Sequence, residues 1–113
     1  MMINYNNKVF VAVSNSENGE VESGMEFLYH QSGNIVTSTY HGDTILYGHL
    51  IAVVDSDSNL DMRYHQINQK GEIMTGICKS TAEIMPNGKV RLHEKWKWTS
   101  GDFSEGDSVL EEK

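Results

Sequence analysis

The sequence predicts an all-β fold, an antiparallel up-and-down meander of about eight strands that closes into a small barrel. Three observations predict it. Apolar and β-branched residues recur in short runs that alternate with a period of two, hardly any window has helical spacing, and Gly, Asn and Asp turn signals separate the runs. A two-sheet β-sandwich of the same strands is the alternative. With 113 residues, the chain is expected to form one domain, residues 1–113.

Short hairpin loops join the expected strands. In chain order, the strands cover residues 8–14, 24–31, 34–41, 44–55, 60–68, 72–80, 89–98 and 108–112. The first alternates valines with Phe10 and Ala12. Tight turns at 32–33 and 42–43 follow the second and third strands, while Gly71 and Gly88 supply the left-handed conformation that three-residue loops need.

Residues 84–101 contain the clearest pattern. The turn at 86–88, Pro-Asn-Gly, precedes a strand whose two faces differ. One face carries Val90, Leu92, Glu94, Trp96 and Trp98, and the other carries Lys89, Arg91, His93, Lys95 and Lys97. This alternation is typical of a half-buried strand. Glu94 lies beside both tryptophans, and a buried carboxylate needs a partner.

Hairpin register decides which residues share a face of the sheet. With two-residue turns, Tyr29 pairs with Val36 and Tyr40 with Ile45. One face then collects Met25, Phe27, Tyr29, Val36, Ser38, Tyr40, Ile45, Tyr47, His49, Ile51, Val53, Asp61, Arg63, His65, Ile67, Ile73, Thr75 and Ile77. The opposite face collects Leu28, Ile35, Leu46, Gly48, Leu50, Ala52, Leu60, Met62, Tyr64, Met74, Gly76 and Cys78.

Both faces are apolar, so we expect one to form the barrel interior and the other to contact a partner subunit in a homodimer or higher homo-oligomer. Gly48, Ala52 and Gly76 on the second face would let another sheet approach closely.

The first face has the composition of a ligand cavity, with apolar walls and a few polar groups. The candidate ligand-binding residues are Tyr29, Tyr47, His49, Arg63, His65, Glu94, Trp96 and Trp98. Arg63 is the expected partner of Glu94, because a guanidinium pairs bidentately with a carboxylate. A buried Arg63–Glu94 pair without any function is an equally good interpretation. A one-residue slip across residues 81–85 would turn Glu94 and both tryptophans to the opposite face.

The sequence gives few signals of catalysis or metal binding. His49, His65 and Asp61 would suit zinc or iron, but no short ligand motif such as His-x-His occurs, so histidines within a polar lining are the favoured interpretation. We expect no metal and no cofactor. General acid/base catalysis by Glu94, His65 or Asp61, as in a lyase or isomerase, stays an alternative. The sequence has no nucleophile elbow, phosphate loop or dinucleotide fingerprint.

Charge and composition exclude several classes of partner. The net charge of −7 and the lack of a basic cluster argue against nucleic acid and an anionic membrane surface. The first residues lack the apolar core of a signal peptide, and no run approaches the roughly 20 apolar residues of a membrane span. We therefore expect a cytoplasmic protein. The single cysteine, Cys78, is expected to be a small buried hydrophobe.

Three segments carry a resemblance to a known group of proteins. They are residues 62–66 (Met-Arg-Tyr-His-Gln), residues 75–78 (Thr-Gly-Ile-Cys) and the stretch from Asn87 to Asp102. The whole chain resembles short bacterial proteins, common in Gram-positive species, that are often labelled N-acetylglutamate synthase. The label implies acetyl transfer, for which synthases resemble mixed α/β acetyltransferases with a Gln/Arg-x-x-Gly-x-Gly/Ala loop opening a helix. This sequence has no such loop.

Two functional hypotheses follow. The favoured one is a barrel, avidin-like or lipocalin-like by strand count and length, that binds a small apolar or aromatic ligand in its interior, with Arg63 and Glu94 as polar anchor. The alternative is an enzyme, either the synthase of the label or the lyase or isomerase described above.

Overall fold

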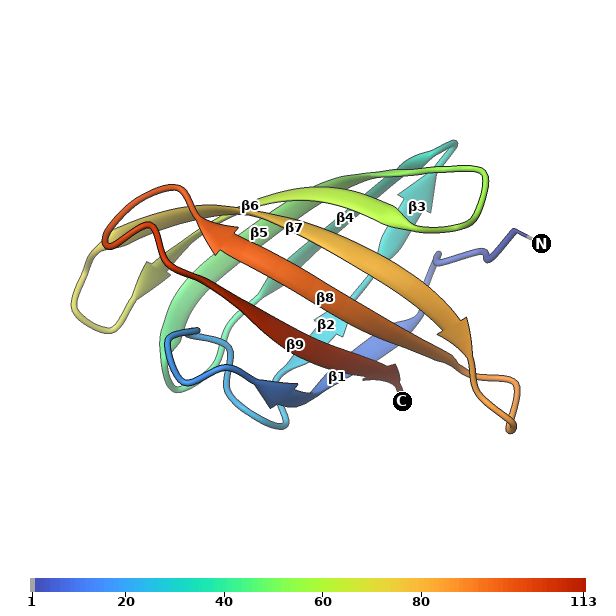
Figure 1. The fold of residues 1–113 in the computed structure, drawn as a ribbon, viewed down its shortest axis with the longest axis horizontal. Helices are drawn as coiled ribbons and strands as arrows, with labels where there is room; N and C mark the ends of the chain where they lie inside the picture. The colour runs from blue at the N-terminus through green and yellow to red at the C-terminus, as the bar shows by residue number, and fades with distance from the viewer. Residues whose placement is uncertain (1) are drawn as a thin grey trace.

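The protein is an antiparallel β-barrel, described here by a computed structural model over residues 2–113. Its strands are β1 (Val9–Asn15), β2 (Glu26–Leu28), β3 (His30–Ser32), β4 (Ile35–Tyr40), β5 (Ile45–Val54), β6 (Leu60–Asn68), β7 (Ile73–Ile84), β8 (Val90–Trp98) and β9 (Glu105–Glu112). They form a single sheet in the order β2-β1-β9-β8-β7-β6-β5-β4-β3 (Figure 1). Within the described chain there is no helix that is long and apolar enough to cross a membrane.

The barrel closes through one run of chain that is interrupted at Tyr29. The part before Tyr29, β2, pairs with β1, whereas the part after it, β3, pairs with β4. The rings of Phe27 on β2 and Tyr40 on β4 lie 4.7 Å apart, which brings the two ends of the sheet together. The predicted all-β barrel is therefore confirmed, and the nine strands correspond to the eight predicted ones with the second divided in two.

Different segments cover the two ends of the barrel. At one end residues 3–5 form a plug, in which the Ile3 amide donates to Ser58 Oγ (2.7 Å) and the Tyr5 hydroxyl donates to the Ser58 carbonyl (2.5 Å). The Tyr5 ring lies 6.2 Å from the ring of Tyr29 inside the barrel. The opposite end is covered by residues 16–25, which join β1 to β2 and which we call the mouth loop.

A β-bulge at the start of β5 sets the register of half the barrel. Ile45 is fully buried, but the next two residues, Leu46 and Tyr47, are both exposed. The strand therefore contains one extra residue before Gly48, which faces the interior. Tyr40 pairs with Gly48, three residues beyond its predicted partner Ile45. Pairing from β5 to β8 then continues without another slip, including the stretch 81–84 of β7.

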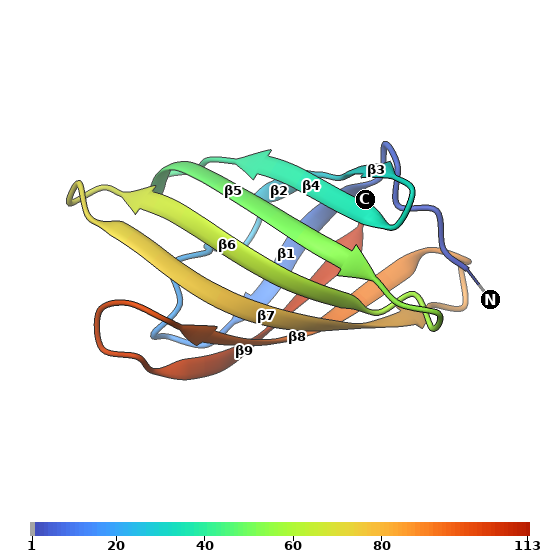
Figure 2. The ribbon, with the colours of Figure 1, turned by 90° about the horizontal axis from the view of Figure 1, so that it is seen from above.

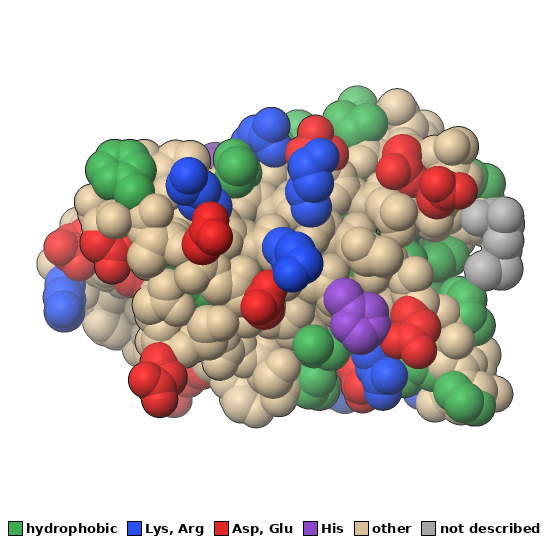
Figure 3. Space-filling view, viewed as in Figure 1, with side chains coloured by type: hydrophobic (Ala, Val, Ile, Leu, Met, Phe, Trp, Pro, Cys, Tyr) green, Lys and Arg blue, Asp and Glu red, His purple; other side chains and the backbone are tan. Residues whose placement is uncertain are grey.

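The bulge exchanges the two predicted faces from Tyr47 to Cys78. The interior takes residues from both predicted sets, and Glu94, Trp96 and Trp98 share it with Tyr64 and Cys78. The isoleucines expected inside, such as Ile51 and Ile77, lie on the outer face of β4–β7, which Figure 2 shows side by side. The outer face of β7–β9 is instead polar, with cationic and acidic side chains interspersed (Figure 3).

Candidate functional site

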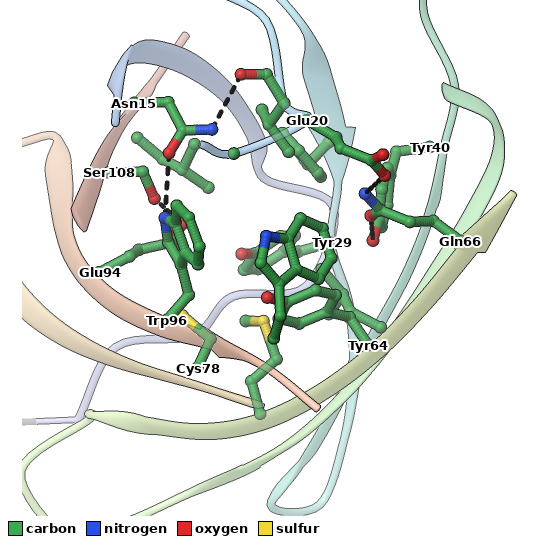
Figure 4. A pocket seen from close by; sticks show the side chains of 17 residues that line it. Asn15, Glu20, Tyr29, Tyr40, Tyr64, Gln66, Cys78, Glu94, Trp96 and Ser108 are labelled. Atoms are coloured by element: carbon green, nitrogen blue, oxygen red, sulfur yellow. Dashed lines mark hydrogen bonds between the residues drawn. The ribbon is translucent and has the colours of Figure 1, made fainter. Parts of the chain in front are cut away.

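A cavity of about 50 Å³ lies inside the barrel, in the half nearer the mouth loop. Every strand except β3 contributes at least one residue to its wall. Its lining residues are Asn15, Gly19, Glu20, Val21, Phe27, Tyr29, Tyr40, Leu50, Met62, Tyr64, Gln66, Cys78, Glu94, Trp96, Trp98, Ser108 and Leu110 (Figure 4). Aromatic and aliphatic side chains thus dominate, with a small number of polar groups among them.

Glycines inside two strands make room for the aromatic wall. A Cβ at Gly48 would collide with the Tyr40 ring, and a Cβ at Gly76 would collide with the Tyr64 ring. A glycine in a strand often marks such a close approach. The predicted role of these glycines, close approach of a second subunit, is therefore wrong. Both lie on the inner face of the barrel and seat tyrosine rings.

The two tryptophans connect the wall of the cavity to its mouth. Their ring centroids lie 5.6 Å apart, and the ring of Tyr64 meets that of Trp98 edge-on at 5.7 Å. Trp96 Nε1 donates to Asn15 Oδ1 (2.9 Å), and Trp98 Nε1 donates to the carbonyl of Asn18 in the mouth loop (3.0 Å). The mouth loop thus provides the acceptor for Trp98, and the last residue of β1, next to that loop, provides the acceptor for Trp96.

Glu20 fastens the mouth loop to the barrel wall. Its carboxylate accepts from Gln66 Nε2 (2.9 Å) and from Asn68 Nδ2 (2.8 Å), both at the end of β6. Gln66 Oε1 in turn accepts from the Tyr40 hydroxyl (2.8 Å). These polar contacts gather on the side of the cavity opposite Glu94 (Figure 4). Hydrogen bonds of this kind hold the loop closed and can be exchanged for contacts with water or a ligand.

Glu94 is the acid of the cavity interior. Ser80 Oγ donates to its Oε2 (3.0 Å) and Ser108 Oγ donates to its Oε1 (2.9 Å). Burial in the barrel raises the pKa of Glu94, and these two hydrogen bonds lower it in part. The accessible surface that the side chain retains opens onto the cavity, since Glu94 is part of its lining. Burial likewise raises the pKa of Cys78, which is therefore a thiol and not a thiolate.

Half of the candidate residues predicted from the sequence meet at this cavity. Tyr29, Glu94, Trp96 and Trp98 are part of its lining. Four others, Tyr47, His49, Arg63 and His65, lie on the outer face, because the bulge at Leu46 and Tyr47 reverses the orientation of β5 and β6.

The expected Arg63–Glu94 pair is wrong, because Met62 pairs with Cys78 and Cys78 with Trp96, which puts Arg63 and Glu94 on opposite faces of the sheet. Arg63 Nη1 instead contacts Asp61 Oδ1 on the outer surface at 2.8 Å. The rings of His49 and His65 lie 5.3 Å apart on that same surface. Among residues 2–113, no group of three or more His, Cys, Asp and Glu side chains could hold a metal ion.

Sequence reasoning missed several residues of the cavity. Asn15, Glu20 and Gln66 belong to no alternating face that the chain pattern singles out, and the structure alone brings them to the mouth. Tyr64 was placed on the outer set. The glycine opposite it in β7, Gly76, was the available signal, because a strand glycine in a sequence rich in aromatics suggests that a ring lies against it.

The fold and the cavity define a class of protein, a closed antiparallel barrel with an aromatic pocket inside it. The chain belongs to the avidin-like protein family, whose family model matches residues 3–113. No curated protein and no solved structure matches the chain.

Proposed function

We propose that this protein binds a small apolar or aromatic ligand in the barrel interior, beneath the mouth loop. The observation that carries the proposal is the cavity itself. Aromatic side chains line it, a few polar groups converge on it, and a loop attached by side-chain hydrogen bonds covers it. Membership of the avidin-like family, which includes binders of small ligands such as biotin, supports the same function.

The size of the cavity requires the mouth loop to move when a larger ligand binds. A volume of about 50 Å³ has room for about four water molecules. A ligand with more atoms extends toward the mouth, where it displaces the contacts of Glu20 and Asn18. Trp98 then loses its carbonyl acceptor in the loop, so its indole N–H becomes available to the ligand.

A screen that follows the two indole N–H signals by proton–nitrogen NMR tests this function. A library of small metabolites, with biotin included as a probe, is added to the wild type and to two leucine variants. Leu50→Phe fills the cavity, since Leu50 is part of its lining, whereas Leu46→Phe makes the same change on the outer surface.

We expect at least one compound to shift both indole signals in the wild type and in Leu46→Phe, and to bind about tenfold or more weakly to Leu50→Phe. The proposal is refuted if no compound shifts these signals at millimolar concentration, or if a hit binds Leu50→Phe as tightly as it binds the wild type.

An enzymatic function is the second candidate, and the buried Glu94 favours it. Of the three acid/base residues suggested by the sequence, Glu94 reaches the cavity, whereas His65 and Asp61 face outward. An enzyme of this kind would therefore use Glu94 without those two partners. The synthase label predicts acetyl-coenzyme A binding, which a concentration-dependent rise in melting temperature would detect. A melting temperature that stays constant up to millimolar acetyl-coenzyme A counts against the label.

The cytoplasmic location stays a prediction.

Self-association of the protein is a further part of the proposal. Large apolar residues cluster on the outer face of β4–β7, where cross-strand neighbours include Ile35 with Val53 and Ile67 with Ile73. Exposed apolar clusters on a sheet commonly mark a protein interface. Analytical ultracentrifugation should show an oligomer that Ile51→Glu dissociates and Val13→Glu, on β1, leaves intact. A wild-type monomer at micromolar concentration contradicts this part.

A further inference from the structure

Glu94 is a carboxyl group without a cationic partner among residues 2–113. Its two oxygens accept hydrogen bonds from Ser80 and Ser108, at 3.0 and 2.9 Å. No lysine or arginine is part of the cavity lining, and among residues 2–113 no buried side chain carries a positive charge. A carboxylate offers about four acceptor positions, so the two serine hydroxyls leave acceptor capacity directed at the cavity.

A second polar group in the same cavity has no hydrogen-bond partner in the part of the chain that the structure describes. The hydroxyl of Tyr29 is buried, and within the described residues no donor or acceptor contacts it. An unpaired buried hydroxyl costs free energy comparable to a lost hydrogen bond. Tyr29 lines the cavity together with Glu94, so a ligand there can satisfy both groups at once.

The rest of the cavity wall suits a positive charge. Trp96, Trp98 and Tyr64 are part of it, and their neighbouring rings lie 5.6 to 5.7 Å apart. The faces of aromatic rings attract cations, tryptophan most strongly, and the attraction increases where water is excluded. A net charge of −7 adds a long-range field that favours the approach of cations over anions.

From these observations we propose that the cavity takes a small organic cation, a protonated amine, amidinium or guanidinium group, whose N–H donors contact Glu94 and the Tyr29 oxygen. This inference rests on the proposed function, because it names the ligand class of the same cavity. The volume of about 50 Å³ matches a head group of about four heavy atoms. Any remaining part of the ligand would extend toward the mouth loop.

The titration of Glu94 makes the binding of such a cation depend on pH. Burial raises the pKa of Glu94, and a bound cation favours its ionised form, so affinity should increase as the pH rises through that pKa and level off above it. The other titratable groups that share the cavity are Tyr29, Tyr40, Tyr64, Cys78 and Glu20. Burial raises the pKa of each of the three tyrosines and of Cys78, which keeps these four groups neutral in the same pH range.

Methylguanidinium and methylurea test the inference as a matched pair, because they share size and planar shape and differ in charge. Binding is measured from tryptophan fluorescence and from the indole NMR signals, at several pH values. Glu94→Gln removes the carboxylate at nearly constant shape, while Glu105→Gln removes the same charge from an exposed position on β9. Comparison of these two variants separates a local contact from the long-range field.

We expect methylguanidinium to bind the wild type at least about tenfold more tightly than methylurea, with an affinity that falls at acidic pH. Glu94→Gln should lower the affinity for the cation about tenfold or more, and Glu105→Gln should change it less than about twofold. The pH dependence in the wild type provides a test that needs no variant.

Two results overturn the inference. If methylurea binds as tightly as methylguanidinium, or if the Glu94→Gln and Glu105→Gln variants bind the cation alike, Glu94 is not a cation site. If a neutral compound from the library then binds the cavity, the proposed function of small-ligand binding is supported, whereas the inference of a cation site fails. If neither matched compound nor any library member shifts the indole signals, both fail.

Discussion

Glu20→Gln is the substitution that tests whether the mouth loop is held closed by the contacts described above. The Glu20 carboxylate accepts two hydrogen bonds, from Gln66 Nε2 and Asn68 Nδ2. A glutamine at this position has nearly the same shape but only one acceptor oxygen. One of the two amide donors must therefore face the new amide nitrogen, and the other loses the charge on its acceptor.

The structure gives the size of the effect. Asn68 Nδ2 has a second acceptor, Glu72 Oε1 at 2.9 Å, so it tolerates the loss of Glu20. Gln66 is 2% exposed, and its amide nitrogen depends on Glu20. Hydrogen bonds to charged groups contribute about 1.5–3 kcal/mol each, and less where the acceptor is half-buried as it is here. The substitution should therefore favour loop opening by about 1–3 kcal/mol, equivalent to a rise in the open population of about 5- to 150-fold.

Hydrogen exchange of the Trp98 indole N–H is the assay, because its acceptor is the Asn18 carbonyl in the mouth loop. Exchange of this proton reports the fraction of molecules in which the loop is open. Glu17→Gln is the control, since it makes the same chemical change at an exposed position of the same loop. Equal exchange rates of the Trp98 indole N–H in Glu20→Gln and Glu17→Gln would show that the Glu20 contacts do not hold the loop closed.

Three other substitutions test the interior. Gly76→Ala should lower the free energy of unfolding by about 1–3 kcal/mol, because the new methyl group meets the Tyr64 ring; a urea midpoint equal to that of the wild type contradicts this contact. Trp96→Phe should cost about 1–3 kcal/mol through the lost hydrogen bond to Asn15 and the volume lost, which thermal unfolding will show; a neutral effect argues against this anchor. Glu94→Gln should abolish a pH dependence of the free energy of unfolding. Between the usual pKa of Glu94 and its raised value, the folded protein binds more protons than the unfolded chain. The stability of the wild type is therefore highest below this pH range and falls as the pH rises through it. The free energy of unfolding is measured with urea from about pH 4 to 8 for the wild type and for Glu94→Gln. If the two proteins show the same dependence on pH, Glu94 is not the cause of that dependence.

The strands and turns were predictable because their signals are local. Gly71 and Gly88 have the positive φ angles, 78° and 84°, that were expected from the loop lengths. Alternation along 89–98 correctly placed Glu94, Trp96 and Trp98 on one buried face. These features depend on residues next to each other in the chain, so a single sequence contains the information.

The residues that line the cavity were less predictable. Which residues face inward depends on the register of each successive hairpin, so an error in one hairpin carries over to the next strands. A single extra residue at Leu46 and Tyr47 reverses the predicted faces of β5, β6 and the first half of β7, and nothing in the local sequence marks that bulge. Arg63 and His65 were placed inside for this reason. Residues 81–85 were the expected weak step, and β7 does pair with β8 in a register other than the predicted one. The pairing is regular from Thr81 to Ile84, but it puts Glu94 on the face of Ser80, opposite Ile77 and Arg63. The contribution of Glu20 depends on a loop that no periodicity describes.

The central claim is that the cavity beneath the mouth loop is a ligand site, and the most direct test is the NMR screen with the Leu50→Phe and Leu46→Phe pair. We expect a compound that shifts the Trp96 and Trp98 indole signals in the wild type and in Leu46→Phe, and that binds Leu50→Phe about tenfold or more weakly. A library without any such compound, or a ligand indifferent to Leu50→Phe, would contradict it.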